Sequence, residues 1–383
     1  MPEMEKPLSD QVALAGTGSD KGFGNALRHG ERIAALGTCK QRSREMYKYL
    51  KDQGSHEFHD RLAADLGGCA NYLVFHNYYT VDQIRLAKAR TCKKHLLCPF
   101  CARARGAKLL EKTLPKFHEI TDASPHLIPA MLTMTVKNGP DLEERFEHLV
   151  SSFRRLQDRR RQVLKGNRGS TEFAKVEGAL FSYEFTYSEE QGWHPHLHAL
   201  VMLNSYIDFE ALKAEWHAIT GDSFIIELHR LQGEPVDAMQ EVFKYAMKFA
   251  DLPLDKNLHA FETLRGKRLM GSFGCFHGVK VPESLTDELL EDLPYIEMFY
   301  QYSPQKRSYE LQEATKKEFT PRVTDEPREY EIVKRPGSEA ATSSPGLSTT
   351  SNGDTDHACN RFSQSRPQPG KTPERRSRRA SGS

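Results

Sequence analysis

Long apolar runs are missing from this chain of 383 residues. No stretch approaches the roughly 18 apolar residues that a membrane-spanning helix needs, and the N-terminal segment MPEMEK lacks the charged and apolar regions of a secretion signal. A strong net charge is missing as well, because 54 basic residues nearly balance 52 acidic ones. We therefore expect a cytoplasmic protein that has no membrane partner.

Cysteine is also rare, and its seven residues do not suggest a disulfide framework. Three are scattered along the chain: Cys39, Cys275 and Cys359. The other four lie between residues 69 and 101, where Cys98 and Cys101 form a C-x-x-C pair. Cys69 and Cys92 would complete a tetrahedral structural zinc site, and His95 is an alternative ligand. A thioredoxin-like redox pair is the competing interpretation, but no strand-helix-strand pattern surrounds it.

Three histidines stand at every second position between residues 194 and 198. Alternate side chains of a β-strand share one face, so His194, His196 and His198 would project together. If the segment 188–193 closes a hairpin, Glu184 lies opposite His196 on the same face. Such a mixed nitrogen and oxygen site suits Mn²⁺ or Mg²⁺, and also Zn²⁺. The alternative is a polar strand face that binds no metal.

A second polar cluster lies in the segment 236–251, which has the period of an amphipathic helix. Its apolar stripe consists of Met239, Val242, Phe243, Ala246, Phe249 and Ala250. The opposite face carries Glu241, Lys244, Tyr245 and Lys248. Tyrosine is a weak nucleophile because its free pKa is about 10, and nearby lysines would help it to react. An exposed tyrosine among ordinary helical charge pairs is the alternative.

Together these patterns resemble the HUH endonucleases, and in particular the replication initiators of rolling-circle plasmids. The matching segments are WHPHLHAL at 193–200, EVFKYAMK at 241–248, and LTMTV at 132–136 followed by Asn138. They occur in the expected order, and the resemblance covers residues 126 to 255. Plasmid initiators also carry cysteines followed by arginines, as Arg103 and Arg105 follow here.

The resemblance implies roles for the site residues. His196 and His198 would bind the catalytic Mn²⁺ or Mg²⁺, with Glu184 as the third ligand and His194 as a supporting residue. The remaining roles fall on the helix: Tyr245 as nucleophile, Lys248 as its assistant, and Glu241 as the base that activates a terminating water.

The expected fold is α+β. Strands 130–137, 179–187, 195–203 and 223–229 and helices 141–165, 208–219 and 236–251 give the order βαββαβα. This order matches the ferredoxin-like, RRM-like palm of HUH enzymes, a central antiparallel sheet covered by helices. The predicted domains are a polar N-terminal extension (1–60), a zinc module (61–118), the catalytic domain (126–255), a C-terminal extension (256–326) and a disordered tail (327–383).

The implied function is metal-dependent, origin-specific DNA nicking and rejoining through a 5′-phosphotyrosine. The partner would be plasmid origin DNA, single-stranded or extruded as a hairpin with flanking duplex, and a host helicase is a further candidate. A basic block supports DNA binding, although it also suits a solvated helix face: Arg154, Arg155, Arg159, Arg160, Arg161, Lys165 and Arg168.

Two rival functions remain. A conjugative relaxase or single-strand transposase uses the same chemistry. A non-catalytic zinc-dependent DNA-binding protein would explain the cysteines but not the histidine strand.

Overall fold

The computed structural model describes residues 23–54, 56–167, 169–223, 225–279 and 284–318. The chain has two compact units, Met1–Thr324 and Asp325–Ser383, and every described residue belongs to the first unit. The predicted disordered tail, 327–383, lies outside the described residues. None of the described helices is both long and apolar enough to span a membrane.

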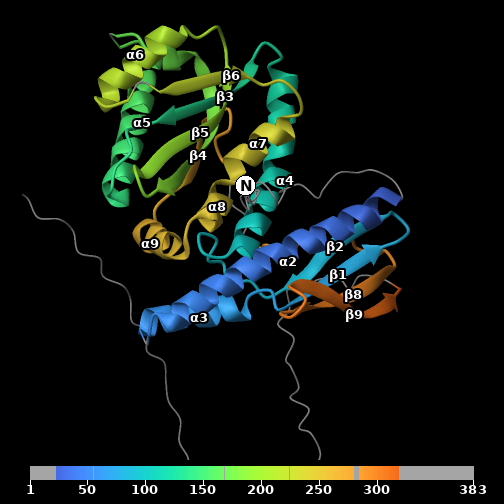
Figure 1. Cartoon of the computed structure of the whole chain (residues 1–383). Helices are drawn as coiled ribbons and strands as arrows, with labels where there is room; N and C mark the ends of the chain where they lie inside the picture. Colours follow the sequence, from blue (N-terminus) through green and yellow to red (C-terminus); the bar gives the residue numbers. More distant parts are fainter. Residues whose placement is uncertain (1–22, 55, 168, 224, 280–283, 319–383) are drawn as a thin grey trace, which may run out of the picture. The chain divides into compact units, whose positions relative to one another are not determined.

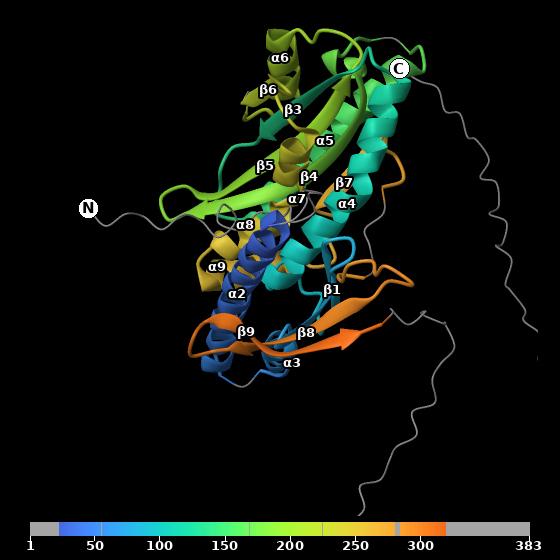
Figure 2. The same cartoon turned by 90° about the vertical axis from the view of Figure 1, so that its right-hand side faces the viewer.

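The described residues form two sheets, and the larger one is antiparallel with the strand order β6-β3-β5-β4-β7 (Figures 1 and 2). Its strands are β3 (Ile128–Thr135), β4 (Val176–Ser188), β5 (Gly192–Leu203), β6 (Ile226–Arg230) and β7 (Met270–Gly274). The first four strands along the chain are arranged 4-1-3-2, which is the ferredoxin-like order, and β7 is added beside β4. The predicted α+β class is confirmed, and the histidine strand β5 is central.

Helices pack against the two faces of this sheet. They are α5 (Leu142–Leu164), α6 (Phe209–Thr220), α7 (Pro235–Phe243) and α8 (Tyr245–Lys248), with 3-10 turns η1 (Glu172–Lys175) and η2 (Phe249–Asp251). Phe146 of α5 packs on Phe185 of β4, with ring centroids 5.8 Å apart. Lys248 of α8 approaches Glu184 on the same strand. Because neighbouring strand residues point to opposite faces, α5 and α8 cover opposite faces of the sheet.

Every predicted element of this domain is present, and the ends differ by up to three residues. One prediction needs correction, because the helix expected at 236–251 is interrupted at Lys244. The ψ angle of Lys244 is −9°, and its carbonyl accepts from Met247 N at 2.7 Å, a bond that spans only three residues. This tighter turn separates α7 from α8 and changes the direction in which Tyr245 points.

The second sheet joins distant parts of the chain in the order β2-β1-β8-β9 (Figure 1). Its strands are β1 (Tyr72–Tyr78), β2 (Gln83–Ala89), β8 (Tyr295–Ser303) and β9 (Ser308–Lys317). The remaining helices are α2 (Phe23–Asp52), α3 (Glu57–Gly68), α4 (Pro99–Ala123) and α9 (Leu254–Leu264). Leu73 and Phe75 of β1 are fully buried and belong to the same hydrophobic core as the buried residues of the larger sheet.

Candidate active site and metal centres

The hairpin of β4 and β5 brings a carboxylate and two imidazoles together. Glu184 stands directly opposite His196, as the sequence predicted. His196 Nε2 lies 3.5 Å from Glu184 Oε1, and His198 Nε2 lies 3.7 Å from Glu184 Oε2. One ligand atom from each of the three residues lies within 4.8 Å of the others. We call this group the triad.

Neighbouring residues orient the histidines. Thr133 pairs with His198 across β3 and β5, and its Oγ1 lies 3.2 Å from His198 Nδ1. This contact occupies Nδ1 of His198 and leaves Nε2 facing Glu184. A histidine that binds a metal ion usually makes such a hydrogen bond with its other ring nitrogen. His194 Nδ1 instead contacts Asn138 Oδ1. His194 therefore lies next to His196 and is not one of the three.

The electrostatics of the triad suit a cation. Burial raises the pKa of the Glu184 carboxyl, but contact with His196 and the charges of His198 and Lys248 lower it more, so the pKa lies below its usual value. Burial also lowers the pKa of His198, which favours the neutral imidazole that binds metals. Among the described residues, Glu184 Oε2 is buried without a hydrogen-bond partner. A carboxylate oxygen left in this way, beside two imidazoles, fits a divalent metal ion.

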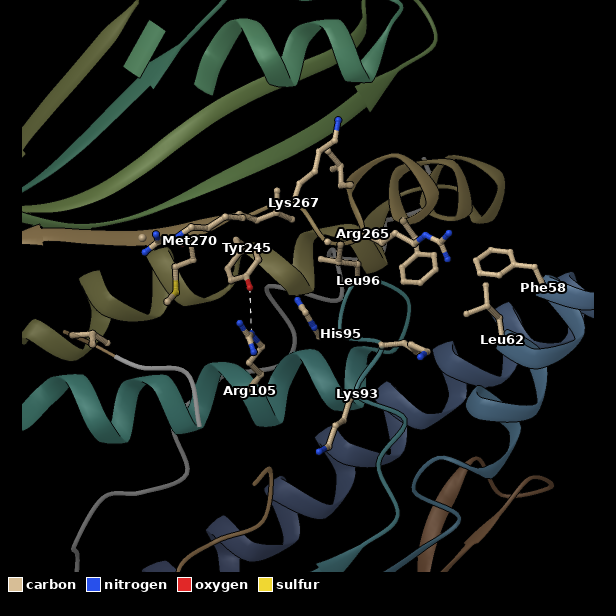
Figure 3. A pocket seen from close by; sticks show the side chains of 18 residues that line it. Phe58, Leu62, Lys93, His95, Leu96, Arg105, Tyr245, Arg265, Lys267 and Met270 are labelled. Atoms are coloured by element: carbon tan, nitrogen blue, oxygen red, sulfur yellow. Dashed lines mark hydrogen bonds between the residues drawn. The ribbon is translucent and has the colours of Figure 1, made fainter. Parts of the chain in front are cut away.

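The helices α7 and α8 bring three of the predicted catalytic residues to different places. Lys248 Nζ lies 3.9 Å from Glu184 Oε1, and the charge of Glu241 acts on His198, so both residues lie near the triad. Tyr245 is only 2% exposed, so the alternative interpretation, in which it is an exposed tyrosine among helical charge pairs, is wrong. Its hydroxyl accepts a hydrogen bond from Arg105 Nε of α4 at 3.3 Å (Figure 3).

Tyr245 also borders a cavity of about 730 Å³. The loop 93–96, Arg105 of α4 and the segment 261–271 complete much of its wall, and no triad residue lines it. His95 lies beside Tyr245, with ring centroids 6.4 Å apart. His95, which the sequence analysis gave as an alternative zinc ligand, is therefore a neighbour of Tyr245. Sequence reasoning missed Arg105 as a partner of Tyr245, and no local pattern marks it.

The four clustered cysteines meet between α3, β2 and α4. Cys69 Sγ lies 3.6 Å from Cys98 Sγ and 3.7 Å from Cys101 Sγ, and Cys92 Sγ lies 3.6 Å from Cys101 Sγ. Zinc bound at about 2.3 Å by four sulfurs in a tetrahedron would separate them by about 3.8 Å. The geometry and the four thiols fit a structural zinc ion.

A buried lysine supports this interpretation. Lys40 is 0% exposed, and its Nζ donates to the carbonyl of Cys69. Burial lowers the pKa of Lys40, whereas negative charge on Cys69 and Cys98 raises it. A zinc ion with four thiolates carries net negative charge, so Lys40 provides a compensating charge where an unpaired ammonium would be costly.

We expect zinc to leave when one sulfur is removed. Wild-type protein should retain about one zinc per chain at the cysteine cluster, and Cys98→Ser should lose one equivalent in elemental analysis after dialysis against Mn²⁺. Cys98 is suited to the test because it is also the N-cap residue of α4. Serine is favoured at N-cap positions, so Cys98→Ser should not destabilise the helix. Cys275→Ser, in the half-buried cysteine outside the cluster, is the control. Equal zinc in wild type and Cys98→Ser would contradict the assignment.

Comparison with known proteins identifies the family. The family described as Replication protein matches residues 83–320, a range that includes the triad, Tyr245 and three of the clustered cysteines. Because the match covers more than half of the chain, the protein belongs to this family. A relative described as "Protein rep" from Streptococcus pneumoniae serotype 2 (strain D39 / NCTC 7466) is 29% identical over 236 residues, 55% of this chain and 69% of the relative. The predicted resemblance to rolling-circle plasmid Rep proteins is confirmed. No solved structure matches.

Proposed function

We propose that this protein is a plasmid replication initiator that nicks and rejoins one strand of origin DNA in the cytoplasm. The observation that carries the proposal is the triad, approached by Glu241 and Lys248 from the helical segment that holds Tyr245. A zinc-dependent DNA-binding protein without catalysis would need no buried carboxylate beside two histidines. Membership of the replication protein family supports the biological role.

Tyr245 is the proposed nucleophile. As its hydroxyl oxygen bonds to the scissile phosphorus, the bond from phosphorus to O3′ breaks. The phenol loses its proton and O3′ gains one, so the products are a 5′-phosphotyrosine and a free 3′-hydroxyl. Arg105 already donates to the phenolic oxygen and would stabilise negative charge on it.

The triad would hold the metal ion. When bound, Mn²⁺ or Mg²⁺ would withdraw charge from the phosphate oxygens. Glu184, His196 and His198 would fix its position, and Lys248 would place a further positive charge beside it. Cleavage requires one phosphate to meet both the triad and Tyr245.

Glu241 is the proposed base for termination. It is half-buried near the triad and lies one helical turn before Tyr245 in the sequence. From there its carboxylate could take a proton from water, which would then attack the regenerated site when a replication round ends. The first nick does not need this water, because the tyrosine itself attacks.

Glu241→Ala should therefore separate initiation from termination. We expect initial nicking to remain within about tenfold of wild type, a loss below ~1.4 kcal/mol, while release after one round fails. Gel analysis should show long multimeric single-stranded plasmid. Asp237→Ala, which removes an exposed carboxylate of α7, should behave as wild type. If Glu241→Ala abolished nicking entirely, Glu241 would be a metal ligand or a structural partner.

Incubation with a supercoiled plasmid that carries the protein's own origin tests the proposal. Open circles with protein attached to the 5′ end are expected when Mn²⁺ or Mg²⁺ is present. Binding without nicking would favour the zinc-dependent DNA-binding protein. A nick only at a transfer origin or a transposon end would favour the relaxase or the transposase.

A further inference from the structure

The cavity beside Tyr245 is strongly cationic. Among the residues that the structure describes, six basic side chains line it and no carboxylate does: Lys93, Lys94, Arg105, Arg265, Lys267 and Arg268. Neither Tyr245 nor the triad requires a hollow of about 730 Å³, a size within the range of ligand sites. A concave surface with one sign of charge attracts and concentrates anions. The cavity therefore has the character of an anion site.

Some of these cations already have acidic partners. Lys94 Nζ lies 3.4 Å from Asp65, and Lys267 Nζ lies 2.7 Å from Glu143. Within the described ranges, Lys93, Arg265 and Arg268 form no ion pair, and all three are exposed. Arg105 sits deeper, where it contacts the phenol (Figure 3). The cations without acidic partners thus stand at the surface of the cavity, with one arginine leading inward to Tyr245.

The rest of the lining suits the apolar body of a ligand. The Arg265 guanidinium lies over the Phe58 ring, 4.5 Å from its centroid, and both residues line the cavity. Leu96 and Leu264 add buried apolar surface. Burial and the charge of Arg105 lower the pKa of His95 to about 4, so its imidazole is neutral at pH 7 and can accept or donate one hydrogen bond.

We propose that this cavity binds one nucleotide of single-stranded DNA next to the cleavage point. A backbone phosphate would lie between Arg105 and Arg268, and the base would stack at the Arg265–Phe58 pair. Stacking platforms combined with arginines are the means by which proteins hold unpaired bases. A base inside a duplex could not enter the cavity without leaving its stack. This inference rests on the proposed function, because it assigns the strand that Tyr245 would cut.

The test measures binding apart from cleavage. The probe is a fluorescein-labelled 20-nucleotide oligothymidylate, and anisotropy is recorded in EDTA so that the DNA stays intact. Arg265→Gln with Arg268→Gln should weaken binding about tenfold and reduce the magnitude of the salt slope by about 0.7, as expected for the loss of the one phosphate contact that Arg268 makes on a single strand. Both side chains are exposed, so the double variant should fold.

A matched control removes the same charge elsewhere. Arg230→Gln with Arg307→Gln changes two exposed arginines, one in β6 and one in the turn between β8 and β9, and should leave affinity within twofold of wild type. Ultraviolet cross-linking of an oligonucleotide containing 5-iododeoxyuridine should label peptides with residues 58–62 or 261–271. The proposal is overturned if the cavity variant binds as wild type does, or if cross-links map to α5 alone.

These experiments distinguish failure of the nucleotide site from failure of the proposed nicking function. If wild-type protein fails to nick its origin but loses oligothymidylate binding in the cavity variant, the endonuclease assignment fails and the nucleotide site stands. If wild type nicks and the cavity variant binds and cross-links normally, the endonuclease stands and the nucleotide site is wrong.

Discussion

Tyr245→Phe should abolish plasmid nicking and the covalent DNA adduct while leaving the affinity for oligothymidylate within about twofold of wild type. The substitution removes the proposed nucleophilic oxygen but keeps the ring that packs in the core. It also removes the hydrogen bond from Arg105, which costs roughly 1 kcal/mol of folding free energy and is too little to unfold the domain. Nicking is measured on supercoiled plasmid, and the adduct is measured by retention of labelled DNA on protein.

Two other tyrosines serve as controls for that experiment. Tyr183 is buried on the α5 side of β4, where its ring contacts Phe146, and Tyr206 is 83% exposed. Tyr183→Phe and Tyr206→Phe should nick normally. Mapping of a trapped adduct to Tyr183, Tyr187 or Tyr206 would show that Tyr245 is not the nucleophile.

Loss of one triad ligand should reduce nicking about a thousandfold or more, because the remaining two groups cannot hold a metal ion in position. We expect this for His196→Ala, His198→Ala and Glu184→Gln, even with saturating Mn²⁺. EDTA should stop the wild type reversibly. Glu184→Gln is the cleanest variant, since it removes a buried charge while preserving the shape of the side chain.

Controls separate this effect from general damage. His229→Ala, on the exposed side of β6, should leave nicking unchanged. His194→Ala should cost only about tenfold to a hundredfold, as expected for a residue that supports a ligand. Thermal unfolding in EDTA should be similar for wild type and Glu184→Gln. Undiminished cleavage in EDTA would remove the metal from the proposal.

The parts of the site that the sequence predicted depend on local order. A period of two places His196 and His198 on one face of the strand. A short hairpin fixes which residue lies opposite them, so the position of Glu184 could be predicted by counting residues back from the turn. The four cysteines also came together as their spacing suggested. Such features depend on a few neighbouring residues, whose geometry is nearly independent of the rest of the fold.

Other features depend on packing between distant segments, which leaves no local pattern. The contact between Thr133 and His198 follows from strand order in the sheet. Arg105 meets Tyr245 across 140 positions because α4 packs against α8. A uniform helical period also placed Tyr245 on the same face as Glu241 and Lys248, whereas the turn at Lys244 alters that relation.

The sheet that joins β1 to β8 has a consequence for protein synthesis. β1 ends at Tyr78 and its partner β8 begins at Tyr295, so 217 positions (295 − 78) separate them. At about 5 to 20 residues per second, the ribosome would need roughly 10 to 45 seconds to cross this interval. Tyr309 of β9 also donates to the carbonyl of Ala70, beside the cysteine cluster, at 2.6 Å. A nascent chain therefore exposes one edge of β1 until translation passes residue 303, and the support around the cysteines is complete only after residue 309 has been made.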